Sequence, residues 1–249
     1  MAIISTIVSI VVLGIIYKRM IGREVPEPIG RAQAIVPVVL GVAALVISFL
    51  ITLASATLLL AVGYVRDEQP MVVQSVMGAF FGAGLSEEVA KGLMILITVA
   101  IFRSRIRNVY EYVLIGAAVG FGFTIFEEFL YGSGLAVILF RLVLITLHLL
   151  FSMIMAYFLG RAKYQKLRGE GSAAGSYVLA FLIPIALHTI YDACTGLNPL
   201  LSSDDDGAVM IGFAIAALGT VVMFVLQIIL LIRFKKRAEK LSMMLFTEP

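Results

Sequence analysis

The chain has 249 residues, of which 61% are hydrophobic and only 14% are charged. An ordinary soluble domain carries about 25% charged residues, so this composition excludes a globule with a fully solvated surface. Long apolar runs between short charged clusters instead predict one membrane domain over residues 1–249. The single cysteine, Cys194, excludes an internal disulfide. The lipid bilayer is the expected surrounding, and no nucleic-acid partner is expected.

Seven apolar segments are long enough to cross a bilayer, which takes about 20 residues in a helix. The expected fold is therefore an all-α polytopic membrane protein with about seven transmembrane helices. The second and third segments exceed one crossing, so they tilt, project beyond the bilayer or break. The first segment has no basic residue ahead of its apolar run, so it is expected to remain as a span and not to be a cleaved signal peptide. The segments are 1–17, 32–64, 71–102, 113–131, 135–160, 177–193 and 208–232.

Basic residues indicate the orientation. Most of the 19 Lys and Arg residues follow the first, third, fifth and seventh segments, so seven crossings place them on one side. By the positive-inside rule that side is cytoplasmic, which puts the N-terminus outside, the C-terminus in the cytoplasm and the protein in the cell membrane. These residues are Lys18, Arg19, Arg23, Arg31, Arg103, Arg105, Arg107, Arg161, Lys163, Lys166, Arg168, Arg233, Lys235, Lys236, Arg237 and Lys240.

The third segment carries Glu87, Glu88 and Lys91 near its middle. An ionisable group at mid-bilayer is costly, so it persists where it pairs, lines water or does chemistry. Glu87 and Lys91 are four residues apart and share a helix face. One carboxylate of the adjacent pair is then left to hold a water or a proton, as a general base in a dry site requires. A structural buried ion pair is the alternative interpretation.

A second acidic pair, Glu127 and Glu128, lies in the outer half of the fourth segment. Arg141 is expected at similar depth on the next segment, where it is a candidate counter-ion. Glu128 could equally be an interfacial residue with no role in chemistry.

The only two histidines of the chain lie on the fifth and sixth segments. His148 is expected about halfway along the fifth. His188 and Asp192 are one helical turn apart on the sixth, so Asp192 could hydrogen-bond the imidazole and fix its tautomer. A polar contact between helices is the alternative for either histidine alone.

Pairs of small residues occur on the two segments that carry the acidic pairs. Gly78 and Gly82 lie on the third segment, and Gly116 and Gly120 lie on the fourth. Such spacing lets helix backbones approach closely, so these glycines predict contact between the two segments.

Four short motifs follow one another on successive segments. They are Glu87-Glu88-x-x-Lys91, Phe123-x-x-x-Glu127, a lone His148, and His188-x-x-x-Asp192. This ordered set resembles the PrsW family of intramembrane proteases, in the superfamily of the CAAX prenyl proteases and the bacteriocin-processing CPBP proteins. The resemblance covers roughly residues 71–193, the expected catalytic core. The lysine in the first motif and the glutamate in the second favour PrsW over the prenyl proteases.

The resemblance implies a membrane-embedded peptidase, treated in the family as a metalloprotease. Its expected substrate is a single-span membrane protein, such as an anti-sigma factor, cut near the outer membrane face during stress. Glu87 or Glu88 would be the general base, with Lys91 pairing the other and Asp192 orienting His188. Zn²⁺ held by Glu127, His148 and His188 would keep a fourth position open for water. A metal-free site, with Glu and His positioning the water, is the other version.

Two other classes of function fit the same residues. A proton- or ion-coupled transporter also places Glu, His and Asp inside spans, but the chain has no obvious internal repeat of the kind common in transporters. A non-catalytic membrane scaffold is the second, although both acidic residues and both histidines are retained.

Overall fold

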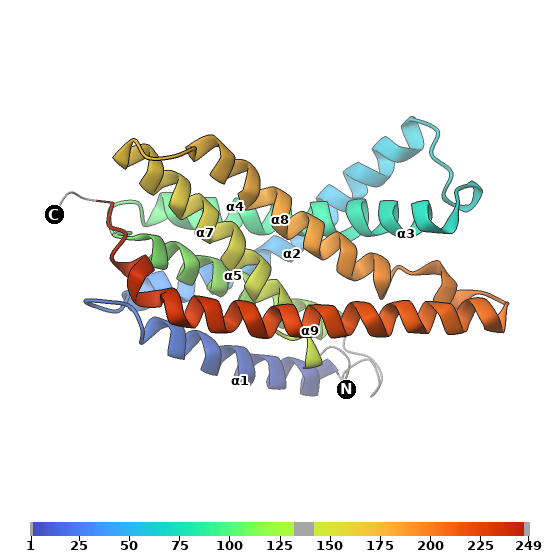
Figure 1. Ribbon diagram of the computed structural model, residues 1–249, viewed down its shortest axis with the longest axis horizontal. Coiled ribbons are helices and arrows are strands. Elements are labelled where there is room, and N and C mark those ends of the chain that lie inside the picture. Colours follow the sequence, from blue (N-terminus) through green and yellow to red (C-terminus); the bar gives the residue numbers. More distant parts are fainter. Residues whose placement is uncertain (1, 132–141, 247–249) are drawn as a thin grey trace.

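The computed structural model describes residues 2–131 and 142–246, and within these ranges the chain is helical with no strand (Figure 1). Two short 3₁₀ turns, Arg66–Glu68 and Pro199–Ser202, lie in the connections. The prediction of an all-α polytopic membrane protein is confirmed. The helices are α1 (Ala2–Ile21), α2 (Arg31–Ala61), α3 (Met71–Ala79), α4 (Leu85–Ile101), α5 (Val109–Tyr131), α7 (Leu147–Arg168), α8 (Ala173–Cys194) and α9 (Asp206–Ser242).

Five stretches of the described chain are long and apolar enough to cross a membrane. The third predicted segment is helical from Met71 to Ile101, but a π-helical turn at Phe80–Gly84 divides it into α3 and α4, each shorter than a span. The described part of the fifth segment enters α7 only at Leu147, and residues 135–141 lie outside the described ranges. The number of crossings and their orientation stay predictions. The five stretches are Ile3–Ile21, Arg31–Ala61, Val109–Leu130, Ala173–Ser202 and Asp206–Ser242.

The helices differ sharply in how much of their surface other helices cover. In the most apolar window of α5, 78% of residues are buried inside the protein, whereas in α9 only 11% are. The uncovered residues of the outer helices are largely apolar, including Leu53, Leu60 and Leu218. Since water would oppose this exposure, the outer surface matches a lipid surrounding.

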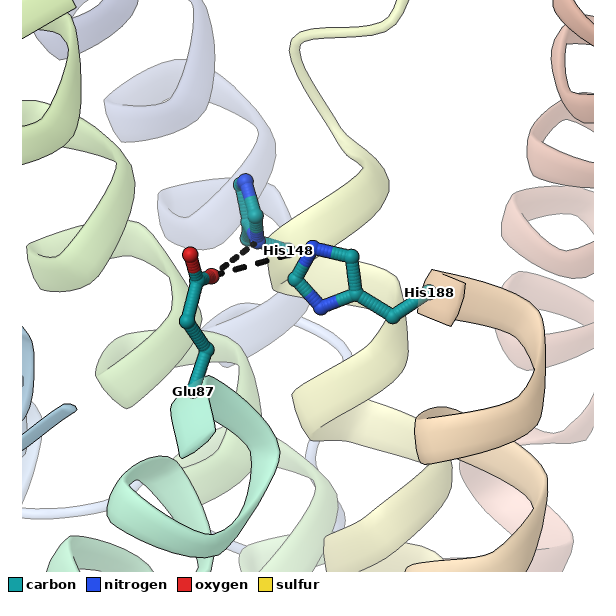
Figure 2. Close-up of side chains that lie close together, drawn as sticks. All are labelled: Glu87, His148 and His188. Atoms are coloured by element: carbon teal, nitrogen blue, oxygen red, sulfur yellow. Dashed lines mark ion pairs between the residues drawn. The ribbon is translucent and has the colours of Figure 1, made fainter. Parts of the chain in front are cut away.

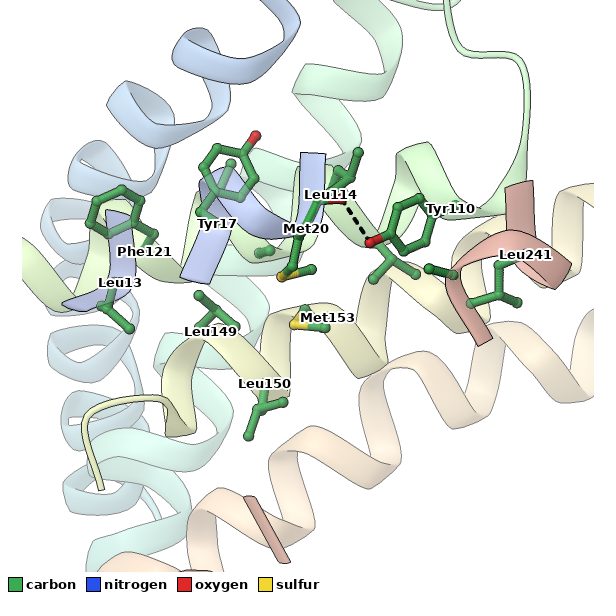
Figure 3. Packing of buried hydrophobic residues seen from close by; sticks show 14 of the residues in the cluster. Leu13, Tyr17, Met20, Tyr110, Leu114, Phe121, Leu149, Leu150, Met153 and Leu241 are labelled. Carbon is green, nitrogen blue, oxygen red and sulfur yellow. Dashed lines mark hydrogen bonds between the residues drawn. The ribbon is translucent and has the colours of Figure 1, made fainter. Parts of the chain in front are cut away.

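The core forms where α5 packs against its neighbours α1, α2 and α7. Leu13 and Tyr17 of α1 meet Leu114 of α5 and Leu149 of α7 in one apolar cluster (Figure 3). The Tyr110 hydroxyl donates a hydrogen bond to the carbonyl of Met20 at 3.0 Å and so satisfies a buried polar group.

Glycines allow α5 to approach two other helices at backbone distance. A Cβ at Gly116 would lie 2.3 Å from the Ser152 carbonyl oxygen on α7, and one at Gly122 would lie 1.9 Å from the Val38 carbonyl oxygen on α2. A Cβ at Gly78 would meet nothing within 4 Å. The predicted contact between the two segments is present, because α4 packs against α5. The glycines of α5, however, lie against α7 and α2 and not against Gly78.

We expect Gly120→Ala to destabilise the protein, because a Cβ there would lie 2.5 Å from the His148 carbonyl oxygen and 2.6 Å from the Leu149 Cα. Neither atom belongs to a flexible side chain, so α7 must move away. Overpacking of this kind costs about 1–3 kcal/mol of unfolding free energy. Thermal unfolding in detergent measures it, with Gly78→Ala as the matched control. Equal unfolding temperatures for the two variants would contradict the close α5–α7 contact.

Most Lys and Arg residues lie on four short stretches of chain, the basic segments, which follow the first, third, fifth and seventh apolar segments. These four basic segments gather at one end of the molecule, on the left in Figure 1. Arg107 ties this end together, with ion pairs to Glu24 at 3.1 Å and to Glu111 at 2.6 Å. The Phe246 amide donates to the Arg107 carbonyl at 2.9 Å, which fastens the residues after α9 to the same place. Burial and repulsion from Glu111 raise the pKa of Glu24 to about 8, although Arg107 opposes the shift.

Candidate active site

The predicted site residues come together away from the basic segments, where α4 and α7 begin and α5 ends. Glu87 and Glu88 lie in the first turn of α4, and Glu127 lies in the last turns of α5. His148 is the second residue of α7, and His188 lies near the end of α8. The expected place of His148 halfway along a span stays a prediction, because residues 135–141 lie outside the described ranges. Each helix thus brings its ionisable residues to one depth.

Local backbone features allow α4 and α8 to meet at this depth. The π-helical turn Phe80–Gly84 ends just before the acidic pair, and π-turns inside helices often occur at functional sites. A Cβ at Gly84 would lie 2.3 Å from the Thr189 hydroxyl and 3.1 Å from the Ile185 carbonyl oxygen. Glycine therefore permits α8 to carry His188 up to Glu88.

Lys91 is fully buried and pairs with both carboxylates of the acidic pair. Its Nζ lies 2.6 Å from Glu88 Oε1, 3.1 Å from His148 Nδ1 and 3.7 Å from Glu87 Oε2. The Phe123 ring, whose centroid is 4.4 Å from Nζ, covers another side of the ammonium. The ammonium thus lies against both carboxylates and one imidazole, and bonds Glu88 most closely.

Each histidine holds one ring nitrogen against a carboxylate. His148 Nε2 lies 2.7 Å from Glu127 Oε2, and His188 Nδ1 lies 2.8 Å from Glu88 Oε1. The opposite nitrogens, Nδ1 of His148 and Nε2 of His188, face Glu87 Oε2 at 3.8 and 3.7 Å. A carboxylate bonded to one ring nitrogen fixes the tautomer of the imidazole and orients the other ring nitrogen toward Glu87.

Glu87 lies between the two imidazole rings (Figure 2). Of the two carboxylates of the acidic pair, it is the one with the longer contacts to its neighbours. Its Oε2 is buried without a hydrogen-bond partner in the described part of the chain. Glu88 is fully buried and also has one such oxygen, Oε2, but its Oε1 is bonded to both Lys91 and His188. The space between Glu87 Oε2 and the ring nitrogens is therefore where a further polar group would be bound.

The donor set at this place fits a divalent metal. Ligand atoms of Glu87, His148 and His188 all lie within 4.8 Å of one another. Donors around a tetrahedral zinc are about 3.3 Å apart, so small side-chain movements would close the set. The sequence prediction placed Glu127 among the ligands. In the structure Glu127 Oε2 lies 2.7 Å from His148 Nε2, and its role as a metal ligand stays a prediction. Asp192 Oδ2 lies 3.2 Å from His188 Nε2, and Lys91 Nζ lies 3.1 Å from His148 Nδ1. Both groups would have to move away from these nitrogens for a metal to bind there.

A cavity of about 820 Å³ opens on the cluster between α5, α7, α8 and α9. Glu87, Glu127, His148, His188 and Asp192 line one side of it. The opposite wall is mostly apolar and comes from α9, through Phe213, Ala216, Ala217, Thr220 and Val221. The cavity is thus large enough for several residues of a peptide and places them against the ionisable groups.

One contact beside the site was missed from the sequence. The Ser5 hydroxyl on α1 donates a hydrogen bond to Glu128, whose side chain is buried inside the protein. The available signal was Ser5 and Ser9, two polar residues one turn apart on a mostly apolar segment, both fully buried. Arg141, the predicted counter-ion, lies outside the described residues.

Comparison with known proteins agrees with this geometry. The sequence profile described as "PrsW family intramembrane metalloprotease" matches residues 31–230. The chain is 30% identical over 134 residues to Protease PrsW of Geobacillus kaustophilus. The aligned region covers 52% of this chain and 56% of that protein. It is 32% identical over 118 residues to Protease PrsW of Halalkalibacterium halodurans, which covers 46% of this chain and 53% of that protein.

The chain thus spans about half the length of the curated relatives that it matches. No solved structure matches it significantly. The family profile covers most of the chain and all the residues of the cluster. The chain belongs to the PrsW family of intramembrane metalloproteases.

Proposed function

We propose that the protein is a membrane-embedded peptidase that hydrolyses peptide bonds of membrane proteins at the Glu87–His148–His188 cluster. The observation that carries the proposal is the position of Glu87 Oε2, buried without a hydrogen bond, 3.7–3.8 Å from an inward-facing nitrogen of each histidine. These groups line a mainly apolar cavity. A water held there would contact a carboxylate on one side and imidazoles on the other, as general-base hydrolysis requires.

Two versions of the chemistry assign Glu87 differently. In one, Glu87, His148 and His188 would hold a divalent metal such as Zn²⁺, which would acidify the attacking water and polarise the scissile carbonyl. In the other, Glu87 is itself the general base. In both, Glu88 and Glu127 orient the histidines, and Lys91 balances the charge of Glu88.

Metal removal separates the two versions. If the metal version holds, prolonged chelation of the purified protein abolishes peptide cleavage, and added zinc restores it. Elemental analysis of the same samples gives the metal content per chain independently of activity. Full cleavage by a preparation shown to contain no metal would leave Glu87 as the base.

The substrate that fits best is a membrane protein cut near the outer face, such as a single-span anti-sigma factor. The cluster lies at the ends of α5 and α8 and at the starts of α4 and α7, away from every basic segment. If the basic end is cytoplasmic, the cluster is in the outer half of the cell membrane. The largely apolar cavity suits a peptide drawn from a lipid-embedded segment.

The route to the cavity follows from its walls. α9 supplies the wall opposite the cluster and is the least covered of the five long apolar stretches. A substrate helix arriving from the lipid would therefore enter between α8 and α9, and its residues near the cut would unwind in the cavity.

Mapping of new protein N-termini tests the proposed function in cells. Cells that express the wild type should contain fragments of single-span proteins cut near the outer face, and cells that express Glu87→Gln should lack them. Identical N-termini under several envelope stresses would reject the peptidase. A flux assay in vesicles would then test the transporter interpretation, and unchanged phenotypes of the variant would favour a scaffold.

A further inference from the structure

A second cavity lies at the basic end of the bundle, far along the helices from the cluster. It has a volume of about 260 Å³ and lies between α1, α5, α7 and α9. Its apolar lining includes Met20, Met153 and Phe234. Figure 3 shows Met20 and Met153 in this region beside Tyr110, whose hydroxyl is already bonded to the Met20 carbonyl. The inner part of the cavity therefore suits an apolar group and not a polar one.

Among the described residues, three cationic side chains and no acidic one line the same cavity. They are Arg19 and Arg23, at and just after the end of α1, and Lys235 of α9. None of the three forms an ion pair with a described residue, although Glu24 is adjacent in sequence to Arg23. Three unpaired cations around one cavity repel each other, so a bound anion would stabilise the arrangement.

The contrast with Arg107 indicates that this lack of partners is local. At the same end of the molecule, Arg107 has carboxylates of Glu24, Glu27 and Glu111 within 4 Å. Glu24 thus turns to Arg107 and leaves Arg23 to the cavity. Acidic partners are available at this end but do not face the cavity.

We propose that this cavity, lined by Arg19, Arg23 and Lys235, binds one anionic phospholipid. The headgroup phosphate would contact the three cations, and an acyl chain would continue over the apolar surface beside it. Ile16 and Leu231 line the cavity itself, and the neighbouring residues in sequence, Ile15 and Ile232, are exposed. Basic pockets between transmembrane helices recognise such headgroups, and anionic lipids attract basic residues by about fivefold in affinity per cation.

Native mass spectrometry of the detergent-solubilised protein tests the site, with dioleoylphosphatidylglycerol and dioleoylphosphatidylcholine as probes. We expect one phosphatidylglycerol per chain, bound at least tenfold more tightly than phosphatidylcholine. The triple variant Arg19→Gln/Arg23→Gln/Lys235→Gln should weaken phosphatidylglycerol binding about a hundredfold, given three contacts. Lys235→Gln alone should weaken it about fivefold, which keeps the test valid if the triple variant does not fold.

A second triple variant, Arg103→Gln/Arg105→Gln/Lys166→Gln, is the matched control. It removes the same charge from exposed positions at the same end, none of which lines the cavity. We expect it to bind phosphatidylglycerol within twofold of the wild type. Equal losses in both triple variants would overturn the site and leave only general attraction to the basic end.

Inorganic phosphate distinguishes the lipid from a free anion. If a lipid is the ligand, phosphate at millimolar concentration leaves the phosphatidylglycerol adduct in place, because phosphate lacks the acyl contacts. If phosphate displaces the lipid fully and raises the unfolding temperature as much, the cavity is a phosphate site and the lipid assignment is wrong.

Discussion

Glu87→Gln is expected to lower peptide cleavage about a hundredfold or more, with little change in unfolding temperature. The amide keeps the size of the side chain but can neither accept a proton nor serve as an anionic ligand. Glu87 is partly open to the cavity, and its Oε2 has no hydrogen bond to lose. The loss therefore falls on chemistry, whichever version of the mechanism holds. Cleavage of a reconstituted substrate and thermal unfolding of the same preparation measure the two effects.

Glu88→Gln should behave differently, although the two residues are neighbours. Glu88 is fully buried, with Lys91 at 2.6 Å and His188 at 2.8 Å. Breaking a buried pair costs about 3–5 kcal/mol of unfolding free energy, and in this variant the Lys91 ammonium keeps only the longer contact to Glu87, at 3.7 Å. Glu68→Gln, at an exposed position between α2 and α3, is the control for both measurements. If Glu87→Gln cleaves normally, the cluster is not the active site; if Glu88→Gln keeps full stability, Glu88 is not the structural partner inferred here.

The convergence of the ionisable residues could be predicted, because an ionisable side chain inside a bilayer is costly unless it has a partner. Glu88, Lys91 and His188 are isolated polar positions in apolar segments, and the cost of burial requires them to find one another. Sequence spacing also predicted that Glu87 and Lys91 share a face, and the ammonium does lie 3.7 Å from Glu87.

The division of roles within the cluster could not be predicted. Glu87 and Glu88 are adjacent and chemically identical, and only the packing of α8 decides that His188 bonds Glu88. The same holds for His148, whose two nitrogens are equivalent in sequence but face Glu127 and Glu87 in the structure. A choice of metal ligands depends on these orientations, so it lay beyond pattern and spacing.

Which helices pack against each other was the other feature that could not be predicted from the sequence. Small residues such as Gly116 mark a close approach but carry no information on which helix approaches. The π-helical turn before Glu87 has a similar origin: its Gly82 and Gly84 permit the backbone to change, but contact with α8 decides where. Tertiary contacts of this kind are absent from any local pattern.

Cross-linking α8 to α9 is expected to abolish cleavage of a membrane-embedded substrate, if the substrate enters between these helices. The native Cys194 on α8 provides one thiol, and Gly219 on α9 faces it. An ideal Cβ at Gly219 lies 2.8 Å from Cys194 Cβ and 3.6 Å from its Sγ. Disulfides have Cβ–Cβ distances of about 3.5–4.5 Å, so α9 must shift outward by roughly 1 Å in Gly219→Cys. α9 is sparsely covered by other helices and can make this shift.

Oxidised Gly219→Cys should lose cleavage, and reduction with a phosphine should restore it to the level of Gly219→Ser, which has similar bulk but cannot cross-link. The double variant Cys194→Ser/Gly219→Cys should be active under both conditions, which separates the disulfide from oxidation elsewhere. If the oxidised variant cleaves at the same rate as the wild type, substrate entry between α8 and α9 is excluded. The assignment of the active site would not be affected by that result. Loss of activity that reduction reverses would instead mean that α9, whose residues form the wall opposite Glu87, must part from α8 before a peptide bond can reach the cluster.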